Sequence, residues 1–168
     1  MSTTPVSNPL RLLFWESTAQ CNLSCRYCRR LDGNTAGDLT YAQGRILIEQ
    51  LTDVGRMQHF SPVLVFSGGE PLLRGDIFDL ISYCAKMSII PAIATNGTLV
   101  DDWVAGRLKG SGAVRAAVSI DGASASTHDS LRGLEGSFDK AIAGAKALHR
   151  AGLAFQFNLT LTRSNCDE

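Results

Sequence analysis

Five short apolar runs divide this chain, and the segments between them carry helix signals. The runs cover residues 12–15, 63–66, 89–94, 114–120 and 155–161. Helices are expected after the capping-box pattern of Thr40 and Gln43, over residues 77–84 and 101–108, and after Ser137. Strands that alternate with helices form parallel βα units with right-handed crossovers. The chain therefore predicts an α/β fold built on five parallel strands.

Three finer expectations concern side-chain packing. Leu47, Leu51 and Val54 recur at helical spacing in the first helix and are expected to face the core. Pro91 lies inside the third apolar run and, because proline has no backbone N–H, predicts an edge or irregular strand. Cys84 falls on the apolar face of the second helix, where it is expected to be an inert core residue.

The charge balance restricts the partners that this chain can have. Its 168 residues carry 16 Lys and Arg against 16 Asp and Glu, which argues against a generic nucleic-acid binder. No apolar stretch reaches the ~18 residues that a membrane span needs, and the first residues do not have the pattern of a signal peptide. We therefore expect a cytoplasmic protein with reduced thiols, in which residues 1–10 form an arm and residues 11–168 a single domain.

Three of the five cysteines, Cys21, Cys25 and Cys28, lie within eight residues. An odd number of cysteines in a reducing compartment favours a metal site over a disulfide framework. Thiolates prefer zinc or an iron–sulfur cluster. A structural zinc needs a fourth protein ligand, and the nearest candidates, His59 and Cys84, lie far along the chain. Three cysteines can instead hold a [4Fe–4S] cluster with one iron open, and zinc or metal-free thiols remain as alternatives at this point.

Glycine-rich and polar motifs follow the second, third and fourth apolar runs. They are Gly68-Gly69-Glu70-Pro71, the Thr-Asn-Gly of residues 95–97, and the Ser-Ile-Asp-Gly of residues 119–122. Paired glycines permit a close backbone approach, and a carboxylate beside them can accept hydrogen bonds from an ammonium group. Because the carboxyl ends of parallel strands meet at one edge of the sheet, these motifs and the cysteines are expected to form one composite site.

The C-x3-C-x2-C spacing, with Tyr27 before its last cysteine and a Gly-Gly-Glu-Pro motif behind it, resembles the radical S-adenosylmethionine (SAM) superfamily. The resemblance implies that the three thiolates hold a [4Fe–4S] cluster, whose open iron is chelated by the amino and carboxylate groups of SAM. One electron then cleaves SAM to methionine and a 5′-deoxyadenosyl radical, which abstracts a hydrogen atom from the substrate. It also implies a partial parallel (β/α) barrel, usually of six strands. Five strands therefore predict a barrel truncated after the fifth strand.

The resemblance assigns roles to residues by their positions in these motifs. The cluster ligands are expected to be Cys21, Cys25 and Cys28. The expected SAM-binding residues are Tyr27 near the adenine, Gly68, Gly69 and Glu70 at the amino group, Asn96 in the pocket wall, Ser119 at the carboxylate or ribose, Arg132 at the carboxylate, and Asn158 on the inward face of the last strand.

Residues 12–18, which lead into the cysteines, and residues 94–99 are similar to the enzymes of alternative haem and haem d1 synthesis. That similarity implies hydrogen abstraction from a tetrapyrrole side chain. Peptide-modifying radical SAM maturases share much of the same front half and are the alternative, together with a non-catalytic cluster- or zinc-binding module. The resemblance thus implies a small-molecule or peptide substrate, and an electron donor such as flavodoxin or ferredoxin.

Overall fold

The computed structural model describes residues 9–29 and 34–168, so most of the predicted N-terminal arm lies outside the described residues. The elements in chain order are β1 (Leu12–Thr18), α1 (Tyr41–Gln58), β2 (Val63–Gly68), the short 3-10 helix η1 (Pro71–Leu73), α2 (Ile77–Lys86), β3 (Ile90–Thr95), α3 (Asp102–Gly110), β4 (Arg115–Ser119), α4 (Ala125–Arg132), α5 (Ser137–Arg150) and β5 (Ala154–Asn158).

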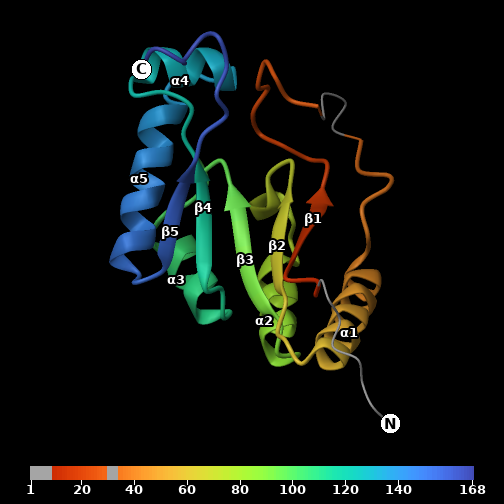
Figure 1. Ribbon diagram of the computed structural model, residues 1–168. Coiled ribbons are helices and arrows are strands. Elements are labelled where there is room, and N and C mark those ends of the chain that lie inside the picture. Colours follow the sequence, from red (N-terminus) through yellow and green to blue (C-terminus); the bar gives the residue numbers. More distant parts are fainter. Residues whose placement is uncertain (1–8, 30–33) are drawn as a thin grey trace.

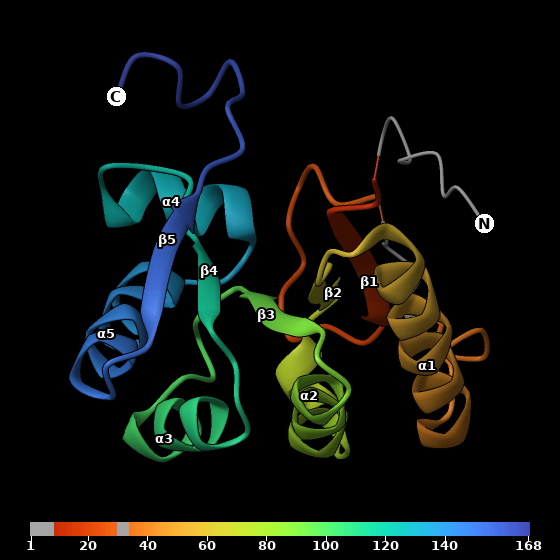
Figure 2. The ribbon, with the colours of Figure 1, turned by 60° about the horizontal axis from the view of Figure 1, so that its bottom comes forward.

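The strands form one parallel sheet in the order β1-β2-β3-β4-β5 (Figure 1). The helices α1, α2, α3 and α5 lie on one face of this sheet (Figure 2), whereas α4 lies beyond the carboxyl ends of the strands. The arrangement is an open, partial α/β barrel, and the predicted fold of five parallel strands is confirmed.

The hydrophobic core lies between the sheet and the helices that cover it. Leu64, Phe66, Ile93 and Val118, from three neighbouring strands, are completely buried there. The other face of the sheet is open and borders a cavity of about 510 Å³, whose wall includes Leu12, Phe14, Val65, Ala92, Ala117 and Asn158. No helix in the described part of the chain combines the length and the apolar character needed to cross a membrane.

The local signals of the first helix are confirmed, but its buried face differs from the prediction. Thr40 caps α1, since its hydroxyl accepts from the Gln43 amide and its own amide donates to the Gln43 side chain. Leu47 and Val54 are only half-buried. The buried positions are Gly44, Ile48, Leu51, Thr52 and Gly55. A Cβ at Gly44 would lie 2.6 Å from the Trp15 ring, so small residues that hydrophobic periodicity does not detect bring the helix onto the sheet.

The prediction of an edge or irregular strand around Pro91 is wrong, because β3 is the central strand. The Pro91 carbonyl accepts a hydrogen bond of 2.9 Å from the Val114 amide, just before β4 begins. In a strand the N–H and C=O of one residue point to the same side. The backbone N–H that Pro91 lacks would therefore face the segment that leads into β4. The proline therefore removes a hydrogen bond only at the amino end of the ladder.

The last strand is shorter than predicted and ends at Asn158 rather than at residue 161. Beyond it the Thr160 amide donates 2.9 Å to a carboxylate oxygen of Asp121. That bond turns the chain out of the sheet and toward the end of β4.

Candidate functional site

The three clustered cysteines lie on the loop that leaves the carboxyl end of β1 (Figure 1). We call residues 19–29 the cysteine loop. Cys21 is exposed, Cys28 is half-buried, and Cys25 is buried with 8% of its surface exposed. The contacts that hold this loop come from the carboxyl ends of β2, β3 and β4, as the composite-site prediction requires.

The end of β2 holds the segment before the first cysteine through its main chain. The Gly69 amide donates 2.7 Å to the Thr18 carbonyl, and the Glu70 amide donates 2.7 Å to the Gln20 carbonyl. A Cβ at Gly69 would lie 2.2 Å from the Gln20 oxygen, and one at Gly68, whose φ is +121°, would lie 2.3 Å from the Thr18 oxygen. The paired glycines thus permit a close backbone approach to the chain itself, directly before the cysteine loop.

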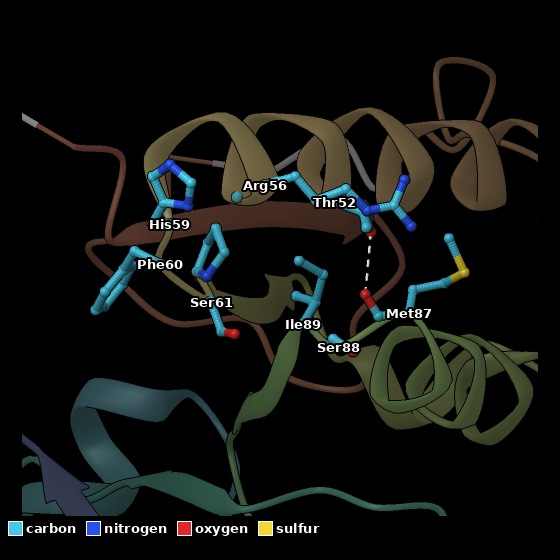
Figure 3. A pocket seen from close by; sticks show the side chains of 10 residues that line it. Thr52, Arg56, His59, Phe60, Ser61, Met87, Ser88 and Ile89 are labelled. Carbon is cyan, nitrogen blue, oxygen red and sulfur yellow. Dashed lines mark hydrogen bonds between the residues drawn. The ribbon is translucent and has the colours of Figure 1, made fainter. Parts of the chain in front are cut away.

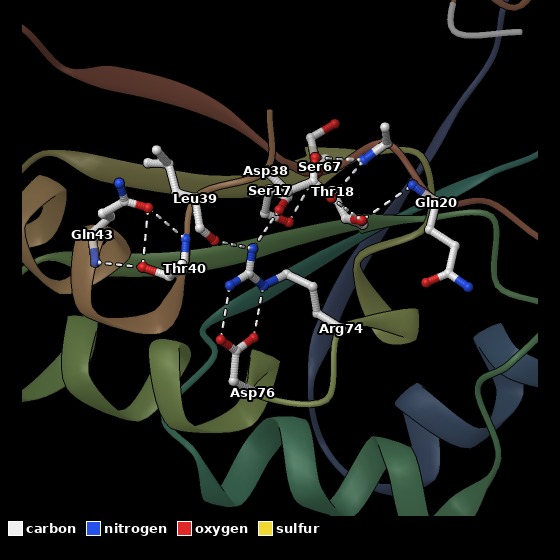
Figure 4. Close-up of polar contacts among 11 residues, drawn as sticks. Ser17, Thr18, Gln20, Asp38, Leu39, Thr40, Gln43, Ser67, Arg74 and Asp76 are labelled. Atoms are coloured by element: carbon white, nitrogen blue, oxygen red, sulfur yellow. Dashed lines mark hydrogen bonds and ion pairs between the residues drawn. The ribbon is translucent and has the colours of Figure 1, made fainter. Parts of the chain in front are cut away.

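Asp38, which follows the cysteine loop in the sequence, binds the segment before the first cysteine (Figure 4). Its carboxylate accepts from the Thr18 hydroxyl at 2.7 Å and from the Ala19 amide at 3.0 Å. The chain therefore returns, after the cysteine loop, to the point where it left β1.

Arg74 binds the same segment, and only 9% of its side chain is exposed (Figure 4). One guanidinium nitrogen donates to the Ser17 carbonyl at 2.6 Å and to the Leu39 carbonyl at 2.9 Å. The other two nitrogens form a bidentate pair with Asp76 at 2.7 and 2.8 Å. Sequence reasoning missed both Arg74 and Asp38, because charged residues in loops are usually solvated and nothing local distinguishes these two.

Glu70 is completely buried, and its carboxylate joins the ends of β2 and β3. It accepts from the Thr95 hydroxyl at 2.9 Å, from the Asn96 amide at 2.8 Å and from the Leu72 amide at 3.2 Å. Burial raises the pKa of Glu70, and these hydrogen bonds oppose the rise. The carboxylate therefore has a clear positioning role, and its expected contact with the SAM amino group stays a prediction.

Asn96 contacts the cysteine loop rather than open space. Its side-chain amide donates 2.8 Å to the Asn22 side chain, beside Cys21. Asn22 in turn donates 2.9 Å to the Thr98 hydroxyl, which itself donates 2.7 Å to the Asn96 carbonyl oxygen. This ring of bonds fastens the first cysteine to the end of β3.

The other end of the cysteine loop is held from β4 and α4. The Tyr27 hydroxyl donates a hydrogen bond to Asp121, a buried residue at the end of β4. The Arg132 Nε lies 2.7 Å from the same carboxylate oxygen, and its guanidinium carbon lies 5.7 Å from the centre of the Tyr27 ring. A terminal nitrogen of Arg132 donates to Cys25 Sγ at 3.9 Å. Burial and the bond to Asp121 raise the pKa of Tyr27, so the phenol stays protonated.

Asp121 is itself fixed by main chain and side chains on every side. Its amide donates 3.1 Å to His128 Nδ1, its carbonyl accepts from the Asn165 side chain at 2.8 Å, and its second carboxylate oxygen accepts from Thr160. Sequence reasoning placed this residue in the motif of residues 119–122 but assigned it no role of its own. Its position directly after a strand end, before Gly122, was the available signal.

Two predicted residues lie next to each other across the last strand pair. Ser119 and Asn158 are register partners in β4 and β5, so their side chains share one face. Asn158 lies in the wall of the 510 Å³ cavity on the open face. The structure thus places Asn158 at this cavity and Ser119 beside it on the same face of the sheet, and their contact with SAM stays a prediction.

The chemistry of the donor set fits a polynuclear cationic centre. Burial raises the pKa of Cys21 and Cys25, and the charges of neighbouring thiolates raise them further, whereas Arg132 acts to lower the pKa of Cys25. Mutual repulsion among the ionised thiols opposes their deprotonation, and a bound iron centre relieves that repulsion. A second cavity, of about 310 Å³, adjoins Cys28. Its wall also includes Tyr27, Ser67 and Gly68, with Glu16 and Arg29.

The distant candidates for a fourth zinc ligand do not approach the loop. Cys84 is completely buried on α2, as predicted, and burial alone raises its pKa to about 12. His59 ends α1 and lines a cavity of about 400 Å³ that also borders Arg56, Phe60 and Met87 (Figure 3). That cavity lies where β2 and β3 begin, at the end of the sheet opposite to the cysteine loop. Within the described ranges, no three His, Cys, Asp or Glu side chains meet at the spacing of a single metal ion.

A family model described as the radical SAM superfamily matches residues 15–167. The chain belongs to the radical SAM superfamily. It is 39% identical over 165 residues to an AdoMet-dependent heme synthase of Methanosarcina barkeri, a match that covers 97% of this chain and 46% of the relative. It is 38% identical over 159 residues to a pre-heme d1 synthase of Dinoroseobacter shibae, with 94% and 38% covered.

A solved radical SAM structure shows the same arrangement of elements. Native anSMEcpe with bound AdoMet and Cp18Cys peptide matches with a TM-score of 0.69 and 26% identity, over 89% of this chain and 42% of that one. The chain thus spans less than half the length of these relatives. The cofactors of the superfamily are a [4Fe–4S] cluster and SAM, as the sequence predicted, and the three cysteines of the cysteine loop stay the predicted ligands of the cluster.

Proposed function

We propose that this chain is the cofactor-binding part of a radical SAM enzyme, with Cys21, Cys25 and Cys28 as the cluster ligands. The observation that carries the proposal is the way the cysteine loop is held. Main-chain bonds from β2, the asparagine ring from β3 and the Asp121–Arg132 pair from β4 and α4 all fix it in place. A site fixed in this way before the cofactor binds loses little conformational entropy on binding.

The cluster, when bound, supplies the electron that cleaves SAM and so generates the radical for hydrogen abstraction. The cysteine loop provides a set of soft thiol ligands, Cys21, Cys25 and Cys28. We assign SAM to the 310 Å³ cavity beside the loop, whose wall includes Tyr27, Cys28 and Gly68. Its volume lies at the lower end of the range for small-molecule sites, about 300–1,000 Å³. The thiols require a reducing compartment, which supports a cytoplasmic location and a low-potential donor such as flavodoxin or ferredoxin.

For the substrate we propose a tetrapyrrole side chain, as in haem or haem d1 synthesis. The two synthases among the relatives support this assignment. The open face of the sheet offers an apolar wall with Phe14 and Val65, and a polar edge with Arg115 and Gln156. Such a surface suits a flat apolar ring that carries carboxylates. A peptide substrate is the alternative, supported by the peptide bound to anSMEcpe.

The test is the formation of 5′-deoxyadenosine from SAM by anaerobically reconstituted protein with dithionite. The parent chain and a Cys166→Ala control, which alters an exposed thiol outside the cysteine loop, should form it, and Cys25→Ala should not. An intact cluster without any deoxyadenosine contradicts the proposed activity. Stoichiometric zinc without acid-labile sulfide, in protein purified without oxygen, would show a non-catalytic zinc module instead.

A further inference from the structure

A buried cation lies against the most enclosed of the three thiols. Arg132 is 8% exposed, as is Cys25, and the guanidinium donates to the Cys25 sulfur at 3.9 Å. The two arginines of the cysteine loop, Arg26 and Arg29, are exposed, and Arg29 pairs with Glu16 at the surface. The charge of Arg132 is therefore the one least screened by water near the thiols.

This guanidinium is held in position by two partners. Asp121 Oδ2 lies 2.7 Å from Nε, and the Tyr27 ring lies against one side of the planar group. The Nε–H has no well-aligned hydrogen-bond acceptor among the described residues, so the contact with Asp121 is an ion pair. Asp121 in turn is bound by His128 and Asn165. The guanidinium of Arg132 is thus held against Cys25.

Reduction adds one electron to a centre that the thiolates already make negative. Hydrogen bonds and positive charge at the ligand sulfurs stabilise the reduced form and raise the reduction potential. We propose that Arg132, held by Asp121, is a positioning residue that sets the reduction potential of the cluster. The inference rests on the proposed function, and it gives Arg132 a different role from the SAM-carboxylate contact that the sequence predicted. Reduction of the cluster takes one electron from a one-electron donor of low potential, and no bond is made or broken.

The test is a redox titration of the reconstituted chain without SAM, followed by the EPR signal of the reduced cluster. Arg132→Gln removes the charge and should lower the equilibrium constant for reduction at least about tenfold, which is 59 mV for a one-electron couple. Arg132→Lys keeps the charge but not the planar fork, so its potential should fall between those of the parent and the Gln variant. Arg26→Gln is the matched control, because it removes an exposed charge beside Cys25, and should leave the potential close to that of the parent.

An unchanged potential in Arg132→Gln, or an equal shift in Arg26→Gln, overturns the inference. Weaker SAM binding with an unchanged potential also overturns it, and supports the carboxylate contact instead. If Arg132→Gln does not take up a cluster, Arg132→Lys provides the test. A reduction potential of Arg132→Lys equal to that of the parent chain refutes the proposed role. A parent chain without any cluster refutes the proposed function itself, so the two failures are distinguishable.

Discussion

Replacing Gly69 with alanine tests whether the end of β2 positions the cysteine loop. The backbone at Gly69 does not have a positive φ, so alanine is tolerated locally and the effect is one of packing. The added Cβ would lie 2.2 Å from the Gln20 oxygen and 2.8 Å from the Ala19 oxygen, and neither backbone atom can move without displacing Cys21. Overpacking costs about 1–3 kcal/mol, and the two main-chain bonds at stake contribute about 1 kcal/mol each. We expect a loss of about 2–4 kcal/mol in the free energy of unfolding.

The assay is urea unfolding of the cluster-free chain followed by circular dichroism, with iron and sulfide counted after reconstitution. Gly75→Ala is the matched control, because a Cβ there meets nothing within 4 Å and Gly75 has no positive φ. That variant should change stability by less than about 1 kcal/mol and keep the full cluster content. Equal stability and equal iron content in the two variants would refute the reasoning.

Three further predictions concern charges and a thiol away from the glycines. Arg74→Met should lower the unfolding free energy by about 2–4 kcal/mol, since two carbonyls lose a buried cationic donor; a change within experimental error in urea unfolding contradicts this. Burial acts to raise the pKa of Asp129, but its hydrogen bonds to the start of α5 prevail, so the pKa is lowered in the folded chain. The ionised Asp129 therefore stabilises the fold at pH values above its pKa in the unfolded chain, and this stabilisation is lost as the pH falls through its pKa in the folded chain. Asp129→Asn should therefore cost about 1–2 kcal/mol at pH 7, and a deficit that persists undiminished below pH ~3 refutes the assignment. With its pKa raised to about 12, Cys84 should resist iodoacetamide at pH 8 in the native chain while the exposed Cys166 reacts, and equal labelling of both contradicts the buried placement.

Short-range patterns in the sequence were sufficient for most of the fold. The capping box at Thr40 and the buried face of α2, which includes Leu80 and Cys84, depend on residues within a few positions of each other. The parallel order followed from strands that alternate with helices. Pro91 was misjudged because the cost of a proline depends on which neighbour its missing N–H faces, and that is a property of the whole sheet.

The carboxyl-end motifs were correctly expected to form one site, but the bonds between them were not foreseen. Tyr27 and Asp121 are 94 positions apart, and Arg74 reaches a carbonyl 57 positions away. Such pairings depend on how the chain crosses itself at the edge of the sheet, and no local spacing encodes them. Asn96 and Arg132 were singled out as ligand contacts, and the structure brings both to the cysteine loop.

The most direct test of the cofactor assignment is low-temperature EPR of the anaerobically reconstituted, dithionite-reduced chain, recorded with and without SAM. The account predicts a [4Fe–4S]⁺ signal that changes shape when SAM is added, because the three cysteines leave one iron open to the cofactor. A cluster signal that is indifferent to SAM, or the absence of any cluster, would contradict it.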